Sequence, residues 1–354
     1  MPFIGNIYDK LRRHPKRVVF PEGNDPRVLQ AAYQLFNLQL GIPLLLGERT
    51  NIRKLAEEFS INLQGIRIID PATNDNLESF ARRYCLMRQH ERIAVEDARS
   101  IVAEPNFFAT MMTAMHQADV MVAGVRDKDG ALLRPVMQIL CPPNSTPTIV
   151  GCQVLELVDN RQIGTDGILF LADCDIHQNP TVEELADIAL SAARFACLMT
   201  STPHRVAILS NTTRPADPTK ANSKEYAAAL LAQERAEKEN IQATFDGELQ
   251  ADTAIVPEIA VRKLGADRLG SVAGRATCLI FPTLESAGIT TRLIKHLTHA
   301  NTFGDIYLGI ERPVAELSRG STAHDILGVT AILGEQCNRQ RQKHPDLSLR
   351  IPGE

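Results

Sequence analysis

Short apolar runs alternate with longer amphipathic segments along most of this chain, and that alternation limits the possible folds more than any other feature. The runs are rich in Val, Ile and Leu, as in strands that are buried on both faces of a sheet. The segments between them repeat apolar residues at helical spacing, as Val28, Ala32 and Leu35 do. Such a sequence predicts an α/β fold with a largely parallel sheet. The expected strands are residues 17–20, 43–46, 66–69, 120–123, 167–172, 206–209, 278–281 and 306–310.

Several helices are also indicated by local signals. Thr181 with Glu184 three residues later has the pattern of a capping box, and the apolar residues that follow repeat at the helical period. Residues 223–239 are charged and Ala-rich, which predicts a solvated surface helix. Residues 326–337 have a helical pattern close to the C-terminus.

The length indicates two domains, because 354 residues are more than one hydrophobic core usually spans. Residues 141–147, Cys-Pro-Pro-Asn-Ser-Thr-Pro, have the clearest linker composition in the chain. We expect a second crossing between the domains near residues 303–308, where composition marks it less clearly.

Composition excludes several classes of function. Trp is absent, aromatic residues are 5% and the net charge is −4, so we expect no nucleic-acid partner. No apolar stretch reaches membrane-spanning length and residues 1–17 lack a signal-peptide core, which predicts a cytoplasmic protein without a membrane partner. The seven cysteines include no Cys-x-x-Cys pair, and no histidine has a second ligand at metal-binding spacing. We therefore expect no disulfide scaffold and no metal.

The most reactive set of side chains lies near the C-terminus, in Ser318-Arg319-Gly320 and Asp325, between an apolar run and a helical pattern. Backbone amides at a strand-to-helix junction favour an anion. Arg319 can bind a phosphate or a developing oxyanion, and Asp325 can accept a proton from a thiol. The structural alternative is that Ser321 or Asp325 caps a helix and Arg319 pairs with a surface carboxylate.

Other motifs occur in an order and at a spacing that give this segment more weight. Taken together, the chain resembles the phosphate acetyltransferase (phosphotransacetylase) family, which includes phosphate butyryltransferases, over roughly residues 15–337. Besides the C-terminal segment, the motifs are Phe-Pro-Glu-Gly at 20–23 with Asp25 and Arg27, Arg88, Asn-Phe-Phe at 106–108, Leu-Arg-Pro at 133–135, Ala-Asp-Cys at 172–174 with Asn-Pro-Thr at 179–181, Asp-Gly-Glu-Leu-Gln at 246–250 with Asp252, and Phe-Pro at 281–282.

The resemblance implies two three-layer α/β domains with the site in a cleft between them, similar to the isocitrate and isopropylmalate dehydrogenase architecture. Residues 1–144 and 309–354 would form the first domain, and residues 145–308 an inserted second one. The family moves an acetyl or other short acyl group between acyl phosphate and coenzyme A in acetate metabolism. The thiolate attacks directly in a ternary complex. Coenzyme A or acyl-CoA, acyl phosphate and phosphate are substrates, no cofactor is permanently bound, and members are commonly homodimers.

Site residues carry over from the family position by position. Ser318, Arg319 and Asp325 would be catalytic, with Asp325 as the base. Arg88 and Arg134 would bind phosphates of coenzyme A, which isolated arginines can do in an otherwise acidic protein. The remaining residues would contact the acyl phosphate: Lys128, Asp129, Thr212, Thr213, Gly288 and Gly320.

Three expected acyl-phosphate loops depart from the family pattern. Lys128 and Asp129 stand where the family has a Ser-Thr pair, and an aspartate there would repel a phosphate dianion by about 1 kcal/mol or more. In the loop 211–216, Pro215 removes one backbone donor. In the loop 284–288, Glu285 adds an unhelpful negative charge. A non-catalytic or weakly active acyl-CoA-binding regulatory paralogue is therefore the alternative function. A decarboxylating dehydrogenase is the third interpretation, although no aspartate cluster supports its metal.

Overall fold

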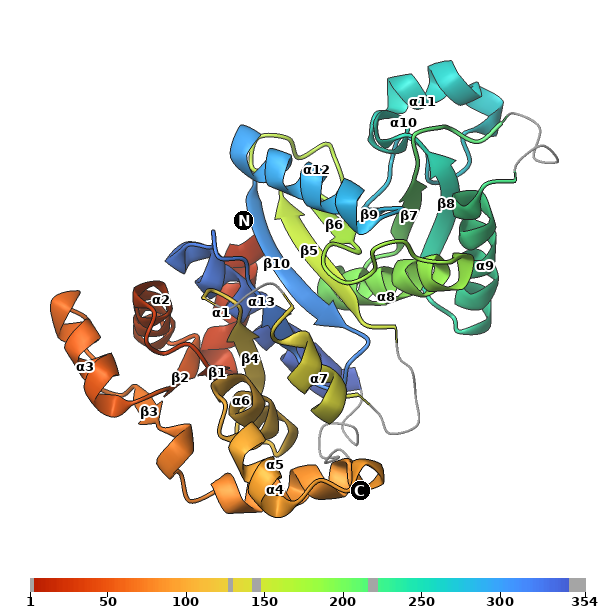
Figure 1. Cartoon of the computed structure of the whole chain (residues 1–354). Helices are drawn as coiled ribbons and strands as arrows, with labels where there is room; N and C mark the ends of the chain where they lie inside the picture. The colour runs from red at the N-terminus through yellow and green to blue at the C-terminus, as the bar shows by residue number, and fades with distance from the viewer. Residues whose placement is uncertain (1–2, 127–129, 142–147, 216–221, 344–354) are drawn as a thin grey trace. The chain divides into compact units, whose positions relative to one another are not determined.

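The computed structural model describes residues 3–126, 130–141, 148–215 and 222–343. Two compact units are formed, Met1–Pro147 with Ile310–Glu354, and Thr148–Gly309; we call them unit 1 and unit 2. Each contains parallel strands covered by helices, so the predicted mixed α/β class is confirmed (Figure 1). That the chain folds as domains with the boundaries expected from the sequence stays a prediction.

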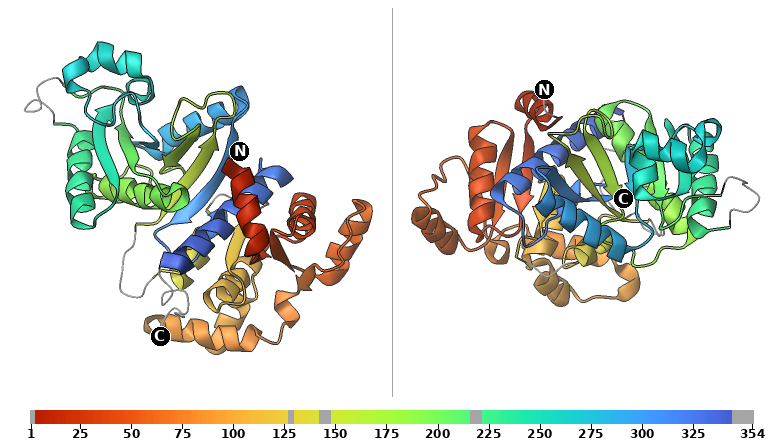
Figure 2. Two further views of the ribbon diagram at one scale, coloured as in Figure 1. Left: turned by 180° about the vertical axis from the view of Figure 1, so that it is seen from behind. Right: turned by 90° about the horizontal axis from the view of Figure 1, so that it is seen from above.

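Unit 1 contains a parallel sheet whose strands run in the order β3-β2-β1-β4-β11. Helix α6 packs against β1 and β4, while α13 packs against β4, α1 and α2. The view from behind in Figure 2 shows α1 and α13 on the face of this sheet opposite to α6. The strands are β1 (Lys16–Phe20), β2 (Gly41–Leu46), β3 (Arg67–Ile69), β4 (Val120–Ala123) and β11 (Val314–Glu316). The helices are α1 (Phe3–Arg13), α2 (Pro26–Asn37), α3 (Arg49–Glu58), α4 (Leu77–Met87), α5 (Val95–Val102), α6 (Pro105–Ala114), α7 (Leu133–Ile139) and α13 (Ala323–Lys343), with short 3₁₀ turns η1 (Pro71–Thr73) and η2 (Gln89–Glu91).

The parallel direction of these strands decides where unit 1 places its loops. Glu316 of β11 pairs with Ala123 of β4, and Val19 of β1 pairs with Met121 two residues earlier. The three carboxyl ends therefore meet at one edge of the sheet. The segments that follow them, residues 21–25, 124–126 and 317–322, all start from that edge.

Unit 2 contains strands in the order β10-β5-β6-β9-β7-β8, of which β5 is antiparallel to both of its neighbours and the last four run parallel. Helix α8 packs against β5, β6, β7 and β9. The strands are β5 (Val150–Glu156), β6 (Ile168–Ala172), β7 (His204–Leu209), β8 (Ala243–Leu249), β9 (Cys278–Ile280) and β10 (Asn301–Leu308). The helices are α8 (Val182–Thr200), α9 (Lys224–Lys238), α10 (Ala251–Ile255), α11 (Pro257–Leu264) and α12 (Leu284–Leu297), with a 3₁₀ turn η4 (Ala266–Arg268).

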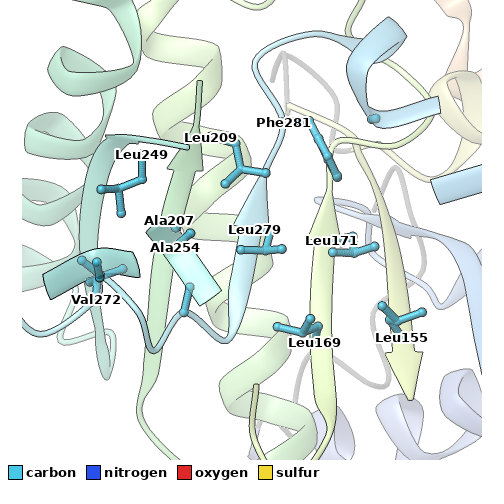
Figure 3. Close-up of a cluster of buried hydrophobic side chains, with 14 of the residues drawn as sticks. Leu155, Leu169, Leu171, Ala207, Leu209, Leu249, Ala254, Val272, Leu279 and Phe281 are labelled. Atoms are coloured by element: carbon cyan, nitrogen blue, oxygen red, sulfur yellow. The ribbon is translucent and has the colours of Figure 1, made fainter. Parts of the chain in front are cut away.

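One hydrophobic cluster holds the sheet of unit 2 together. Leu155, Leu171, Leu279 and Leu209 lie on four neighbouring strands and point to the same side of the sheet (Figure 3). All are less than a tenth exposed. Burying each such side chain contributes roughly 1.5–3 kcal/mol relative to leaving it exposed. Leu171, Leu279 and Leu209 of this core therefore come from apolar runs that indicated strands in the sequence, whereas Leu155 comes from β5.

The structure confirms the predicted capping box and corrects several other expectations. The capping box is present, because Thr181 Oγ1 accepts from Glu184 N and Glu184 accepts from Thr181 N. Strands β5, β8 and β11 were not predicted. Strand β8 was missed because it contains the polar stretch Asp246-Gly247-Glu248, and β11 because it is only three residues long. Residues 284–288 were expected to form a loop, but they are the first turns of α12, which begins there because Thr283 Oγ1 accepts from Ser286 N at 3.2 Å.

The described residues include no helix that is long and apolar enough to cross a membrane.

Candidate active site

The segment Ser318-Arg319-Gly320 forms an exposed turn between β11 and α13. Leu317 N donates to Ala123 O at 2.7 Å, so β11 stays paired to β4 until just before the turn. Ser321 N then donates to Ser318 O at 2.9 Å and closes the turn, and α13 begins two residues later. The turn therefore lies between a strand end and the amino end of a 21-residue helix, where backbone amides and the helix dipole favour negative charge.

Asp325 lies in the first turn of α13 and takes part in a reciprocal cap. Its Oδ2 accepts from Thr322 N at 2.9 Å, while Thr322 Oγ1 accepts from Asp325 N at 3.2 Å. The capping role that the sequence offered as the structural alternative is therefore present. A carboxylate has roughly four acceptor sites, so a capping role and a role as proton acceptor are compatible in one side chain.

The segment after β4 packs tightly against the turn. Gly124 has φ +100°, and a Cβ atom there would lie 2.5 Å from Leu317 O. Only glycine fits both this backbone conformation and this close approach. Farther along, Gly130 N donates to the buried Glu316 side chain at 3.0 Å. Lys128 and Asp129, which the sequence analysis places in this loop, lie outside the described residues.

The segment after β1 binds both of these loops. The buried Glu22 carboxylate accepts from Val125 N at 2.9 Å and from Arg126 N at 2.6 Å. Arg27 donates to Arg319 O at 2.6 Å, Ser321 O at 3.0 Å and Val125 O at 2.8 Å. From the sequence, Glu22 and Arg27 were identifiable only as parts of a motif. The signal in the sequence was that both charged residues lie close to Gly23, directly after the predicted strand that ends at Phe20.

Asp25 holds Arg27 in place. Arg27 Nε and Nη2 bind its two carboxylate oxygens at 3.0 Å each. Burial by itself would raise the pKa of Asp25, but hydrogen bonds from the guanidinium and backbone of Arg27 outweigh it and leave that pKa below its ordinary value. Asp25 is therefore an anion throughout the neutral range, and the pair contributes no net charge to the loops that it joins.

Arg88 and Arg134 form a second cluster in unit 1, around Tyr84. Arg88 caps the end of α4 and binds Glu91, while Arg134 is exposed in the first turn of α7 with its guanidinium 5.7 Å from the centroid of the Phe107 ring. Burial raises the pKa of the Tyr84 hydroxyl, and the nearby charges of both arginines oppose that rise. The structure thus brings the two predicted coenzyme A arginines near the same side chain.

The predicted residues of unit 2 have different surroundings. Thr212 Oγ1 donates to Glu248 Oε1 at 2.5 Å, and Thr213 Oγ1 donates to Gln250 Oε1 at 3.2 Å. In this arrangement neither hydroxyl offers its proton to a phosphate. Gly288 is buried inside α12, where a Cβ atom would lie 2.7 Å from Arg292 Nη1.

A histidine–aspartate pair that was not predicted from the sequence lies in the loop after β6 of unit 2. His177 Nδ1 lies 2.5 Å from Asp173 Oδ2, and this contact raises the pKa of the imidazole against the opposing effect of burial. Asp173 also accepts from several backbone amides, including that of Gly151 at 2.8 Å. The four-residue spacing was the only signal in the sequence. Among the residues that the structure describes, no three His, Cys, Asp or Glu side chains are placed to hold a metal ion.

Comparisons with known proteins show which family this chain resembles. The family model described as phosphate acetyl/butaryl transferase matches residues 2–333. A phosphate acetyltransferase of Acetivibrio thermocellus is 34% identical over 95% of this chain and 98% of its own length. The solved EutD phosphotransacetylase of Staphylococcus aureus and a phosphotransacetylase of Streptococcus pyogenes each have a TM-score of 0.81 at 30% identity, covering 95% of this chain and 98% of theirs.

Proposed function

Since this chain belongs to the phosphate acetyl/butaryl transferase family, we propose that it transfers a short acyl group between an acyl phosphate and coenzyme A. The observation that carries the proposal is the exposed Ser318-Arg319-Gly320 turn at the amino end of α13, with Asp325 on the first turn of that helix. This arrangement places a fixed cation and a carboxylate on one short segment. Acyl transfer to a thiol requires both, one to stabilise an oxyanion and one to take a proton.

The proposed reaction is a direct transfer in a ternary complex. A thiol has an ordinary pKa near 8.5 and is mostly protonated at neutral pH, so Asp325 accepts the thiol proton of coenzyme A as sulfur attacks the acyl carbonyl. The carbonyl oxygen becomes negative and Arg319 stabilises it. The new C–S bond then forms fully, the bond from carbon to the phosphate oxygen breaks, and phosphate leaves with that electron pair. Ser318 donates one hydrogen bond that orients the thiol or the intermediate.

Coenzyme A would enter as a substrate, not as a resident cofactor. Arg88 and Arg134 are the proposed ligands of its phosphates, and their shared position around Tyr84 supports their acting together. Arg134 is exposed near the amino end of a helix, where a cation is unfavourable unless an anion is present. The acyl-phosphate roles predicted for Lys128, Asp129, Thr212, Thr213, Gly288 and Gly320 stay predictions.

Arsenate-dependent loss of thioester absorbance tests this function with the purified chain. We expect acetyl-CoA, propionyl-CoA or butyryl-CoA to be consumed, because arsenate replaces phosphate as acceptor and its acyl ester hydrolyses. If the chain bound coenzyme A saturably but consumed none of the three thioesters, the non-catalytic regulatory alternative would be established.

We further propose that the chain is a homodimer that pairs through α12. Ile289, Leu293 and Leu297 recur every four residues on one face of this helix, and each is more than half exposed. In an antiparallel pair of α12 helices, the apolar stripe of one copy would cover the same stripe of the other. Such a self-complementary surface favours a second copy as the occupant.

Sedimentation velocity tests this interface. Leu293→Glu should convert the dimer to a monomer, because two carboxylates would be buried at the centre of the pair. Leu230→Glu is the matched control, since Leu230 is as exposed on another helix of the same unit, α9. A monomeric wild-type chain, or a Leu293→Glu variant that stays dimeric, would refute the interface.

A further inference from the structure

The guanidinium of Arg27 is fully engaged by groups of unit 1. A guanidinium has five N–H donors. Nε and one Nη2 donor bind Asp25, and the other Nη2 donor binds Val125 O at 2.8 Å. The two Nη1 donors bind Arg319 O at 2.6 Å and Ser321 O at 3.0 Å. Within the described part of the chain, each of its five donors therefore has an acceptor.

Three of those acceptors are backbone carbonyls of the two loops at the edge of the sheet. Arg319 and Ser321 flank Gly320 in the sequence. Arg27 therefore binds the turn on both sides of its glycine, the residue whose backbone is least restricted. Val125 O belongs to the loop that follows β4. One side chain thus joins the turn to the neighbouring loop, and Glu22 binds the same loop through the amides of Val125 and Arg126.

The backbone of Arg319 fixes where its side chain starts. If the carbonyl of that residue moved by an ångström, the guanidinium that we assign to the oxyanion would move with it. Misplacement on that scale can reduce the rate of a catalysed step by about 100-fold. Because its own donors are occupied, Arg27 has none left for a substrate. Its role is therefore to position other groups.

We propose that Arg27, oriented by Asp25, is a positioning residue that holds the Ser318-Arg319-Gly320 turn in its catalytic arrangement; this rests on the function proposed above. Lysine cannot replace it, because an ammonium has three donors on a flexible chain and cannot bind all these acceptors in one plane. Asp25→Asn should act in the same direction, since the amide loses one acceptor for the guanidinium.

Turnover of Arg27→Lys and Arg27→Ala tests the proposal. We expect kcat to fall by roughly 10- to 100-fold while the KM for coenzyme A changes less than threefold, because the predicted phosphate ligands are elsewhere in unit 1. Added guanidinium ion should restore part of the kcat of Arg27→Ala and none of that of Arg27→Lys, whose side chain fills the space.

Arg17→Lys is the matched control. Arg17 also forms a two-pronged pair with an aspartate, Asp119, at 3.0–3.1 Å, but it lies at the amino end of β1, away from the turn. It should lower thermal stability by a similar amount and leave kcat within twofold of wild type. An Arg27→Lys variant with wild-type kcat, or an Arg17→Lys variant that loses as much kcat, would overturn the positioning role.

Hydrogen exchange separates this proposal from the function on which it rests. The amide of Ser321 should exchange at least tenfold faster in Arg27→Lys than in wild type, and equally fast in Arg17→Lys. If the wild-type chain consumed no thioester, the proposed reaction would fail. Unchanged exchange at Ser321 would overturn the positioning role whether or not the chain turns over a thioester.

Discussion

Asp325 has two roles in this account, as a helix cap and as a base, and Asp325→Asn separates them. The carboxylate accepts a backbone hydrogen bond from Thr322 N at 2.9 Å. Asparagine keeps an oxygen that can accept it, so the cap survives. What is lost is a negative charge in the first turn of α13, which stabilises a helix by about 0.3–1 kcal/mol. For a unit of this size that corresponds to a fall in Tm of roughly 1–4 °C.

The effect on catalysis should be far larger. An amide cannot take the thiol proton, and a positioned general base contributes about 10²- to 10⁴-fold in rate. We therefore expect Asp325→Asn to retain its fold and coenzyme A binding while kcat for thioester consumption falls by at least 100-fold. Both quantities can be measured on one preparation, by calorimetry and by thioester absorbance.

Thr322→Ala is the complementary variant. It removes the hydroxyl that accepts from Asp325 N at 3.2 Å, at a cost of about 0.5–2 kcal/mol, and leaves the carboxylate in place. It should lose more stability than Asp325→Asn and far less kcat. Wild-type kcat in Asp325→Asn would refute the assignment of the base. Equal losses of kcat in both variants would mean that the cap, not proton transfer, is what the reaction needs.

Three further predictions concern other parts of the chain. Burial lowers the pKa of His204 to about 4, below the ordinary 6.5, so the unfolded chain binds more protons than the folded chain between pH 7 and pH 5. The free energy of unfolding should therefore fall by about 2 kcal/mol over that range. Denaturant titrations should show a smaller pH dependence of this free energy in His204→Gln. Arg134→Ala should raise the KM for coenzyme A about tenfold with little change in kcat, an effect that added salt should reduce; steady-state kinetics at two ionic strengths would detect it. Leu279→Ala, at the centre of the cluster in Figure 3, should destabilise unit 2 by about 2–5 kcal/mol in chemical denaturation, and a loss below 1 kcal/mol would contradict the packing described.

The sequence predicted most of the buried parallel strands but missed β5, β8 and β11, of which β8 is interrupted by polar residues and β11 is only three residues long. Val120–Ala123 was predicted with its exact bounds because every residue of β4 is apolar and buried. In β8, Asp246 and Glu248 interrupt the apolar pattern, since they bind Arg214 and Thr212 from the neighbouring strand's loop. The apolar pattern within one β-strand does not reveal such partners, because they lie more than thirty residues away in the sequence.

The same limit applies to the candidate site. The Ser-Arg-Gly turn and Asp325 were identifiable because their chemistry is concentrated in eight residues. The part played by Arg27 was not, because it depends on contacts with Arg319 and Ser321 almost three hundred residues away. Likewise, a glycine is required at position 124 by a carbonyl of Leu317, which only the folded chain brings near.

The most direct test of the central claim is the stoichiometry of the reaction of acetyl-CoA with inorganic phosphate. Free thiol is measured with a chromogenic disulfide, and acetyl phosphate is measured in the same sample by phosphorus NMR. We predict one acetyl phosphate for each thiol released, and loss of both products in Arg319→Ala. Thiol release without acetyl phosphate would show a hydrolase, and no thiol release from acetyl-, propionyl- or butyryl-CoA would contradict acyl transfer altogether.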